Sequence, residues 1–240
     1  MKHSTLEKSI LLLSIMVLIV ASIGSMVEII PLFIKEVSVE RVDGARPHSP
    51  LELLGFNIYK REGCYSCHSQ QIRVLDFDVS RYGHYSLSAE SMYDYPAQWG
   101  SKRTGPDLAR IGGKYSNEWH VRHLRKPQEV VIQSVMPSYK FLEHRALDYS
   151  TVQKQMKIYQ SIGVDYSDKD IAEYERDIKI QLGYEKDAKA IENFNQRYPN
   201  AAIGKFNEQS KDITEMDALI SYLQALGKKV AIETNRGIKW

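Results

Sequence analysis

The stretch Gly63-Cys64-Tyr65-Ser66-Cys67-His68 contains both cysteines of this 240-residue chain. Cys64, Cys67 and His68 form the C-x-x-C-H pattern that is typical of c-type haem attachment. The spacing suits that chemistry, because two thiols about one helical turn apart can reach two vinyl groups of one porphyrin while the imidazole lies over the iron. The pattern predicts one covalently bound haem c, with His68 as an axial ligand of the iron.

Two other kinds of site use a C-x-x-C pair, namely dithiol redox centres and zinc sites. A structural zinc site needs further ligands, and the chain has no other cysteine. A redox dithiol does not require His68, and no βαβ pattern precedes the pair. Haem attachment is therefore the favoured interpretation, and a redox or accidental pair is the alternative.

The charge balance and the length limit the possible classes of function. Lys and Arg total 32 and Asp and Glu total 30, so the formal net charge is +2. This balance argues against a nucleic-acid binder that relies on phosphate neutralisation. No nucleophile beside a base, no paired carboxylates and no phosphate-binding glycine loop are evident, so we expect no active site of the chain's own. The length suits one anchored domain, or a small domain with a sizeable insert.

An apolar segment lies close to the N-terminus. It runs from Ile10 to Val27 without a charged residue and continues beyond Glu28. About 20 apolar residues suffice for a membrane-spanning helix. A cleaved signal peptide is the alternative, because Ala21–Ser25 offers small residues, but its apolar region is usually only about 7 to 15 residues long. The segment therefore predicts an uncleaved membrane anchor.

The charges that flank this segment predict its orientation. Lys2 and Lys8 precede it, and the positive-inside rule assigns that side to the cytoplasm. The rest of the chain would then lie in the periplasm, on the side of a bacterial inner membrane where c-type haem is attached. Glu28 is either solvated at the interface or paired with a partner helix. We expect Pro31 to kink the helix or to end it one turn later.

Two amphipathic helices are predicted to carry the folded domain. The first begins at Pro50, and the second spans Thr214 to Leu226 and stops at Gly227. Gly55 shares a face with Tyr59, so another helix can approach closely there. The first and last helices of small cytochromes c cross at such a position. The predicted fold is all-α, with one N-terminal transmembrane helix followed by a class I-like cytochrome c domain with insertions.

A haem iron that passes electrons with little rearrangement needs a sixth ligand. Met136 stands in Ser134–Pro137, where the following proline disfavours helix and predicts an extended strap. Such a strap can cross the far face of the haem, so Met136 is the predicted second axial ligand. Met92 is the reserve candidate, Met156 is expected either on the surface or in packing, and Met216 is expected in the core.

The segment Thr104-Gly105-Pro106-Asp107-Leu108 resembles the G-P-x-L turn of cytochromes c. In that turn the proline carbonyl accepts the Nδ1 proton of the proximal histidine and fixes its ring. The resemblance implies that Pro106 orients His68.

Three further histidines are weaker ligand candidates. Ser116 is predicted to cap a short helix that contains His120 and His123 and ends near Pro127. These histidines lie one turn apart and could bind a metal ion. No carboxylate or cysteine partner is evident, so we expect solvated or hydrogen-bonded side chains instead. His84 is a possible second histidine ligand of the haem, although Met136 is better placed.

Together these stretches resemble the membrane-anchored monohaem subunit, subunit II, of bacterial cbb3-type cytochrome c oxidases. The resemblance covers the anchor and most of the domain, and it is carried by the stretches 27–33, 61–70, 81–86, 98–110 and 214–220. It implies that Cys64 and Cys67 carry haem c and that His68 and Met136 ligate its iron. The subunit would lie between a dihaem cytochrome c subunit and the haem-copper catalytic subunit, and would pass electrons to the haem b of the latter.

The resemblance also implies that oxygen reduction belongs to the catalytic subunit. The long stretch from Gln70 to Lys102 would be a docking surface for that subunit or a cover for the haem edge. Two departures from the family pattern stand out: Gln71 replaces a usual methionine, and the chain is longer near 180–210. There a charged helix with Ile191, Phe194 and Tyr198 is expected to pack one side on the domain, with partner binding as the alternative.

The expected organisation is an anchor at 1–34, a linker at 35–49, a monohaem domain at 50–227 with an insert at about 180–210, and a tail at 228–240. The favoured function is an electron-transfer subunit of the oxidase. A free-standing membrane-anchored electron shuttle is the first alternative. A haem-based sensor or a structural assembly subunit is the second.

Overall fold

The computed structural model describes residues 8–33, 39, 42, 44–208, 210 and 212–230. The chain divides into two units, Met1–Arg41 and Val42–Trp240, which are considered separately. The ordered elements of the described residues are helices without a β-strand, and one isolated bridge joins Ala146 to Thr214. The predicted all-α fold class is confirmed. Lys2, part of the predicted linker and most of the predicted tail lie outside the described residues.

The first unit consists of helix α2 (Ile10–Ile29) and the 3₁₀ turn η1 (Ile30–Phe33). Ser9 caps α2 by accepting a hydrogen bond from the amide of Leu12. Twenty helical residues span about 30 Å, which matches the hydrocarbon core of a bilayer. Within the described part of the chain, the segment 10–33 is the one helix long and apolar enough to cross a membrane, and none of its residues is buried in protein. It fits a membrane anchor.

Helix α2 ends at Ile29, two residues before Pro31, whereas the sequence predicted that Pro31 would kink the helix or end it one turn later. Proline has no N–H with which to continue the hydrogen-bonding ladder, so the chain tightens into η1 instead. Glu28 lies exposed in the last turn of α2, an arrangement compatible with either of its two expected roles.

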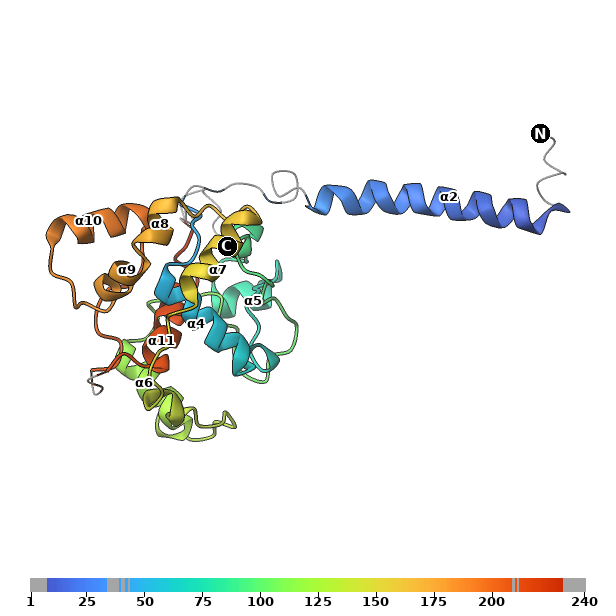
Figure 1. Ribbon diagram of the computed structural model, residues 1–240. Helices are drawn as coiled ribbons and strands as arrows, with labels where there is room; N and C mark the ends of the chain where they lie inside the picture. The colour runs from blue at the N-terminus through green and yellow to red at the C-terminus, as the bar shows by residue number, and fades with distance from the viewer. Residues whose placement is uncertain are drawn as a thin grey trace, which may run out of the picture. The chain divides into compact units, whose positions relative to one another are not determined.

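The second unit is organised around the crossing of α4 (Pro50–Arg61) and α11 (Glu215–Ala225), which Figure 1 shows at its centre. Both helices begin with capping boxes, Ser49 with Glu52 and Thr214 with Asp217, which satisfy the first free amides. A Cβ atom at Gly55 would lie 2.0 Å from the carbonyl oxygen of Ala218. The absence of a side chain at Gly55 therefore permits the crossing, as the sequence predicted.

Helix α6 (Asn117–Arg125) is the support for the chain that follows it. Ser116 caps it by accepting from the amide of Trp119 at 3.2 Å, and the helix ends before Pro127, as predicted. The 3₁₀ turns η4 (Pro127–Glu129) and η5 (Lys140–Glu143) flank a segment that has no regular secondary structure at 134–139.

Four helices follow, in the order α7 (Val152–Ser161), α8 (Asp168–Ala172), α9 (Tyr174–Gln181) and α10 (Ala188–Arg197). Phe194 and Tyr198 are buried, so the charged α10 packs one face on the domain, as expected. Arg197 joins three elements through ion pairs with Asp170 at 2.9 Å, Glu173 at 3.0 Å and Asp177 at 2.5 Å. Helices α8 and α9 were not predicted from the sequence. Their contacts with α10 include buried charge pairs, and charged residues do not contribute to the apolar periodicity by which a helix is recognised.

The long stretch between residues 70 and 102 contains α5 (Asp76–Tyr82) and the 3₁₀ turn η3 (Ser88–Ser91). Its base is closed by two hydrogen bonds between Ile72 and Ser86, each of 2.9 Å. This stretch is thus an ordered part of the domain.

Candidate functional site

The C-x-x-C-H pattern folds as one tight turn directly after α4. Gly63 has a φ of +69°, which reverses the chain at little steric cost for a residue without a Cβ. The 3₁₀ turn η2 (Cys64–Ser66) follows, and the carbonyl of Cys64 accepts from the amides of Cys67 at 3.2 Å and His68 at 3.0 Å. Both cysteines are free, half-buried thiols. Two thiols and one imidazole are therefore presented from a single turn.

The environment of Cys64 bears on the redox alternative. Burial raises the pKa of its thiol to about 12, so the thiol stays protonated at neutral pH. Redox-active cysteines depend on a thiolate and have lowered pKa values. The raised pKa of Cys64 therefore argues against dithiol exchange.

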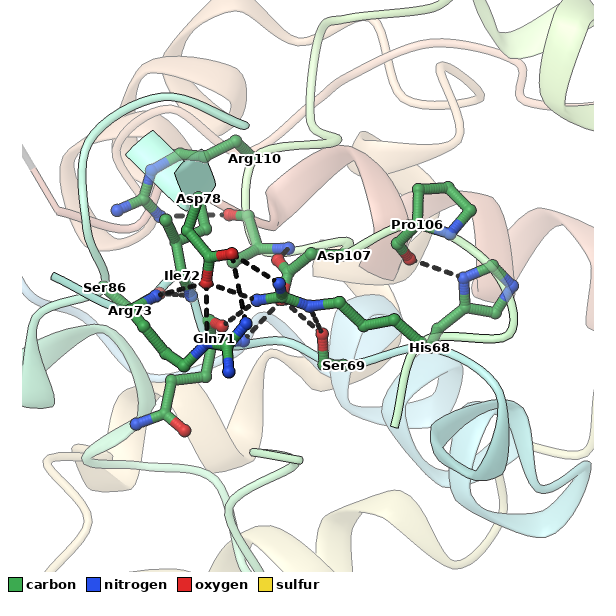
Figure 2. Close-up of polar contacts among 12 residues, drawn as sticks. His68, Ser69, Gln71, Ile72, Arg73, Asp78, Ser86, Pro106, Asp107 and Arg110 are labelled. Atoms are coloured by element: carbon green, nitrogen blue, oxygen red, sulfur yellow. Dashed lines mark hydrogen bonds and ion pairs between the residues drawn. The ribbon is translucent and has the colours of Figure 1, made fainter. Parts of the chain in front are cut away.

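His68 is held in one orientation by the turn at residues 105–108. Its Nδ1 donates to the carbonyl oxygen of Pro106 at 2.8 Å, as Figure 2 shows. Backbone hydrogen bonds of 2.9 Å from Gly105 to Cys67 and from Leu108 to Ser69 join the two segments. Because Nδ1 is engaged, Nε2 is left as the ring atom with a free lone pair, the state that a metal-binding imidazole needs.

Gly105 lies against the face of this imidazole. A Cβ atom there would lie 2.2 Å from Cε1 of His68 and 2.8 Å from both ring nitrogens. The contact leaves no room for any side chain at this position. Glycine is therefore required next to Pro106 if His68 is to keep its orientation.

Asp107, which follows Pro106, connects the same turn to the chain beyond His68 through hydrogen bonds. Its carboxylate accepts from Ser69 Oγ at 2.6 Å and from the amides of Gln71 at 2.9 Å and Ala109 at 2.8 Å. The backbone of Gln71 thus contributes to this network.

A second carboxylate, Asp78 of α5, lies fully buried in the same polar cluster (Figure 2). Arg103 contacts it at 2.8 Å and Arg73 contacts it at 2.8 Å. These hydrogen bonds, Arg103 first, hold the pKa of Asp78 well below its usual range. Arg103 also donates to Ser69 Oγ at 2.7 Å, so the cluster braces the residue next to His68. This network was not predicted from the sequence, although Arg103 and Asp107 both lie within the stretch 98–110 that carries the family resemblance.

The segment 134–139, here called the strap, carries Met136 and is held by α6. The amide of Tyr139 donates to the carbonyl of Leu124 at 2.8 Å, and Ser138 Oγ donates to the carbonyl of Arg125 at 2.6 Å. Burial raises the pKa of Tyr139, and the nearby Cys64 and Cys67 raise it further. The strap therefore approaches the turn that carries the thiols, with Met136 half-buried against the core.

The other methionines have different surroundings. Met156 and Met216 are both 0% exposed within the core, which decides the role of Met156 in favour of packing. Met92 is partly buried against the same core. His84 lies with its Nδ1 2.7 Å from the carbonyl of Tyr85 and stacks on that ring.

One ring nitrogen of each of His120 and His123 is buried. Nε2 of His120 and Nδ1 of His123 have no hydrogen-bond partner among the described residues. The His123 side chain as a whole is half-buried. Burial, followed by the charge of His123, lowers the pKa of His120 to about 4. In the described ranges, no group of three or more His, Cys, Asp or Glu side chains is placed to hold a metal ion.

The residues of the turn fit a haem. Two free thiols stand on one turn, an imidazole has its outer nitrogen already bonded, and a glycine makes room at the ring. A half-buried thioether is available on the strap. This donor set, sulfur and nitrogen without a second cysteine pair, is that of a haem site rather than a zinc site.

Comparison with known proteins agrees with this assessment. A search of curated proteins finds no match. A family model described as cytochrome c oxidase, mono-haem subunit/FixO, matches residues 3–230, a range that includes the apolar helix and the haem-type turn. The match extends over far more than half of the chain, which therefore belongs to the FixO family of mono-haem cytochrome c oxidase subunits.

Proposed function

We propose that this chain is the electron-transfer subunit of a cbb3-type oxidase. One covalently bound haem c would pass electrons to the haem-copper catalytic subunit, which reduces oxygen to water, and would receive them from the dihaem cytochrome c subunit. The observation that carries the proposal is the turn at 64–68, with its two free thiols and an imidazole fixed by Pro106. Membership in an oxidase subunit family supports the choice of partners.

The chain's own residues have distinct roles in this proposal. Cys64 and Cys67 would hold the haem through their sulfur atoms, each S–H adding across one vinyl group so that one C–S bond and one C–H bond form. Nε2 of His68 and Sδ of Met136 would hold the iron, and the carbonyl of Pro106 would position His68. The haem supplies the one-electron chemistry, and the protein supplies ligation, burial and orientation.

The proposed organisation follows the sequence: anchor 1–34, linker 35–49, haem domain 50–227 and tail 228–240. The domain would lie in the periplasm, attached to the bacterial inner membrane by a single span. Lys8, at the N-terminal end of α2, supports a cytoplasmic N-terminus.

Purification of the full chain in mild detergent tests the function. We expect it to co-isolate with a haem-copper subunit and a dihaem cytochrome c, and its intact mass to equal the polypeptide plus one haem. A haem-bearing monomer whose deletion leaves the oxidase assembled would instead identify a free-standing shuttle. A mass equal to that of the bare polypeptide would refute haem attachment altogether.

Met136→Ala tests the axial ligand. Loss of the thioether should leave the iron five-coordinate or misligated, lower its reduction potential and slow electron delivery to the oxidase. Optical spectra and a redox titration of the purified protein measure these effects. Met92→Ala is the matched control and should leave the potential unchanged. If Met92→Ala lowers the potential and Met136→Ala does not, the ligand is Met92.

A further inference from the structure

Arg103 connects the two backbone segments that hold His68. Its Nε donates to Ser69 Oγ at 2.7 Å, and its Nη2 donates to the carbonyl oxygen of Gln71 at 2.8 Å. Ser69 Oγ in turn donates to the Asp107 carboxylate at 2.6 Å (Figure 2). A chain of hydrogen bonds therefore runs from a guanidinium through a hydroxyl to a carboxylate, and each bond polarises the next.

Ser69 and Asp107 are the immediate neighbours of the two groups that form the His68–Pro106 hydrogen bond. Ser69 follows His68 in the chain, and Asp107 follows Pro106, whose carbonyl oxygen lies 2.8 Å from Nδ1 of His68. A carbonyl oxygen only accepts, so this contact requires a proton on Nδ1. Ser69 is 0% exposed and Asp107 is 6% exposed, so water has little access to the bond between them. That bond therefore controls how closely the imidazole and the carbonyl approach each other.

Asp78 of helix α5 holds the guanidinium in place. Its carboxylate oxygens accept from Nη1 of Arg103 at 2.8 Å and from Nη2 at 3.0 Å, which makes a bidentate pair. The Asp78 side chain is fully buried, and that of Arg103 is largely buried. The guanidinium carbon also lies 5.1 Å from the centre of the Tyr82 ring, at the end of α5. Helix α5 belongs to the long stretch between residues 70 and 102, so this stretch fixes the orientation of Arg103.

We propose that Arg103 is a positioning residue that sets the strength of the His68–Pro106 hydrogen bond. The proposal rests on ligation of the haem iron by His68 in the proposed function. An imidazole whose Nδ1–H makes a stronger hydrogen bond donates more electron density from Nε2. Such donation favours the ferric state, so a weaker hydrogen bond would raise the reduction potential. Loss of a nearby positive charge would have the opposite effect, because it also favours the ferric state.

Arg103→Lys separates position from charge. A lysine retains the positive charge but replaces three fixed nitrogens by one nitrogen at the end of a flexible chain. In the full-length haem-bearing chain in detergent, we expect a higher reduction potential. We also expect the Nδ1 proton of His68 to exchange with solvent about threefold to tenfold faster, the range of one neutral hydrogen bond. A redox titration measures the potential, and NMR of the reduced protein with isotope-labelled histidine measures the exchange.

Arg73→Lys is the matched control. The Arg73 side chain also donates to Asp78, at 2.8 Å and 3.2 Å, but the hydrogen bonds of the described residues do not link it to Ser69. This variant should leave the potential and the exchange unchanged. Arg103→Gln removes the charge as well, so its potential should lie below that of Arg103→Lys while the exchange is equally fast. If Arg103→Lys fails to load haem, Ser69→Ala, which interrupts the same chain of hydrogen bonds without removing a charge, provides the test.

The possible outcomes separate this inference from the proposed function. A wild-type chain without haem, or with a haem that lacks an imidazole ligand, refutes the proposed His68 site, and this inference falls with it. Failure to co-isolate with an oxidase would refute the function and leave this inference standing. Haem-loaded Arg103→Lys with the potential and the exchange of wild type overturns this inference alone.

Two further results would overturn it. An effect of Arg73→Lys as large as that of Arg103→Lys would mean that any disturbance of Asp78 suffices. A lower potential in Arg103→Gln, combined with wild-type behaviour of Arg103→Lys, would mean that Arg103 acts through its charge alone.

Discussion

Gly105 shows how one residue controls the orientation of the proximal imidazole. The nearest heavy atom to a Cβ at this position would be Cε1 of His68, at 2.2 Å, a distance that requires the ring to move. The ring cannot move far without losing its hydrogen bond to Pro106. Orientation at His68 is therefore determined jointly by a hydrogen bond on one ring atom and steric contact on the ring face.

Gly105→Ala should accordingly displace the imidazole and break the hydrogen bond to Pro106. We expect reduced haem loading and, in the protein that does load, a partly high-spin ferric spectrum from a weakened His68 bond. Haem content per chain and optical spectra measure this. Gly100→Ala is the control, because a Cβ at Gly100 meets no atom within 4 Å. Equal haem content and equal spectra in the two variants would contradict the steric argument.

At the scale of secondary structure, the α4–α11 crossing determines the core. A Cβ at Gly55 would lie 2.0 Å from the backbone oxygen of Ala218 and 2.7 Å from Cβ of Tyr222. Neither atom belongs to a flexible side-chain end, so the two helices would have to separate. Because every residue of α11 from Met216 to Ala225 is buried, separation would disturb packing along the whole helix.

We expect Gly55→Ala to destabilise the domain by about 3 kcal/mol, at the upper end of the usual cost of overpacking. For a domain of this size the midpoint of thermal unfolding should fall by roughly 6–12 °C. Circular dichroism on heating the detergent-solubilised chain measures this change. Gly24→Ala, a matched change within helix α2 that meets no atom within 4 Å, should leave the domain's midpoint unchanged. A midpoint in Gly55→Ala equal to that of wild type would show that the crossing can relax.

At the scale of the whole molecule, the proposed orientation of the anchor in the membrane determines the compartment in which the haem domain lies. A periplasmic domain would face the compartment in which thioether attachment takes place. Protease added to spheroplasts should therefore degrade the haem domain and leave the apolar helix in the membrane, whereas inside-out vesicles should protect the domain. Immunoblotting against the domain and the anchor distinguishes the products. Protection in intact spheroplasts would reverse the proposed orientation.

Local patterns in the sequence were sufficient to predict much of this protein's structure. The haem-type turn, the apolar helix and the caps at Ser49 and Ser116 each depend on residues only a few positions apart. The predicted crossing at Gly55 needed one further assumption, that the two most apolar helices of the domain pack together. The structure contains this crossing and the hydrogen bond from His68 to Pro106. The assignments of His68 and Met136 as iron ligands remain predictions.

What the sequence by itself determined is the set of elements whose signal is local: a membrane-length apolar helix, a turn with two thiols and an imidazole, and two amphipathic helices. Tertiary structure alone decided which polar groups are paired. Asp78 and Arg103 meet across 25 residues, Arg197 joins three helices, and Nδ1 of His123 is buried without a hydrogen-bond partner among the described residues. The physical reason is that the pairing and burial of a polar side chain depend on distant segments, which no short pattern records.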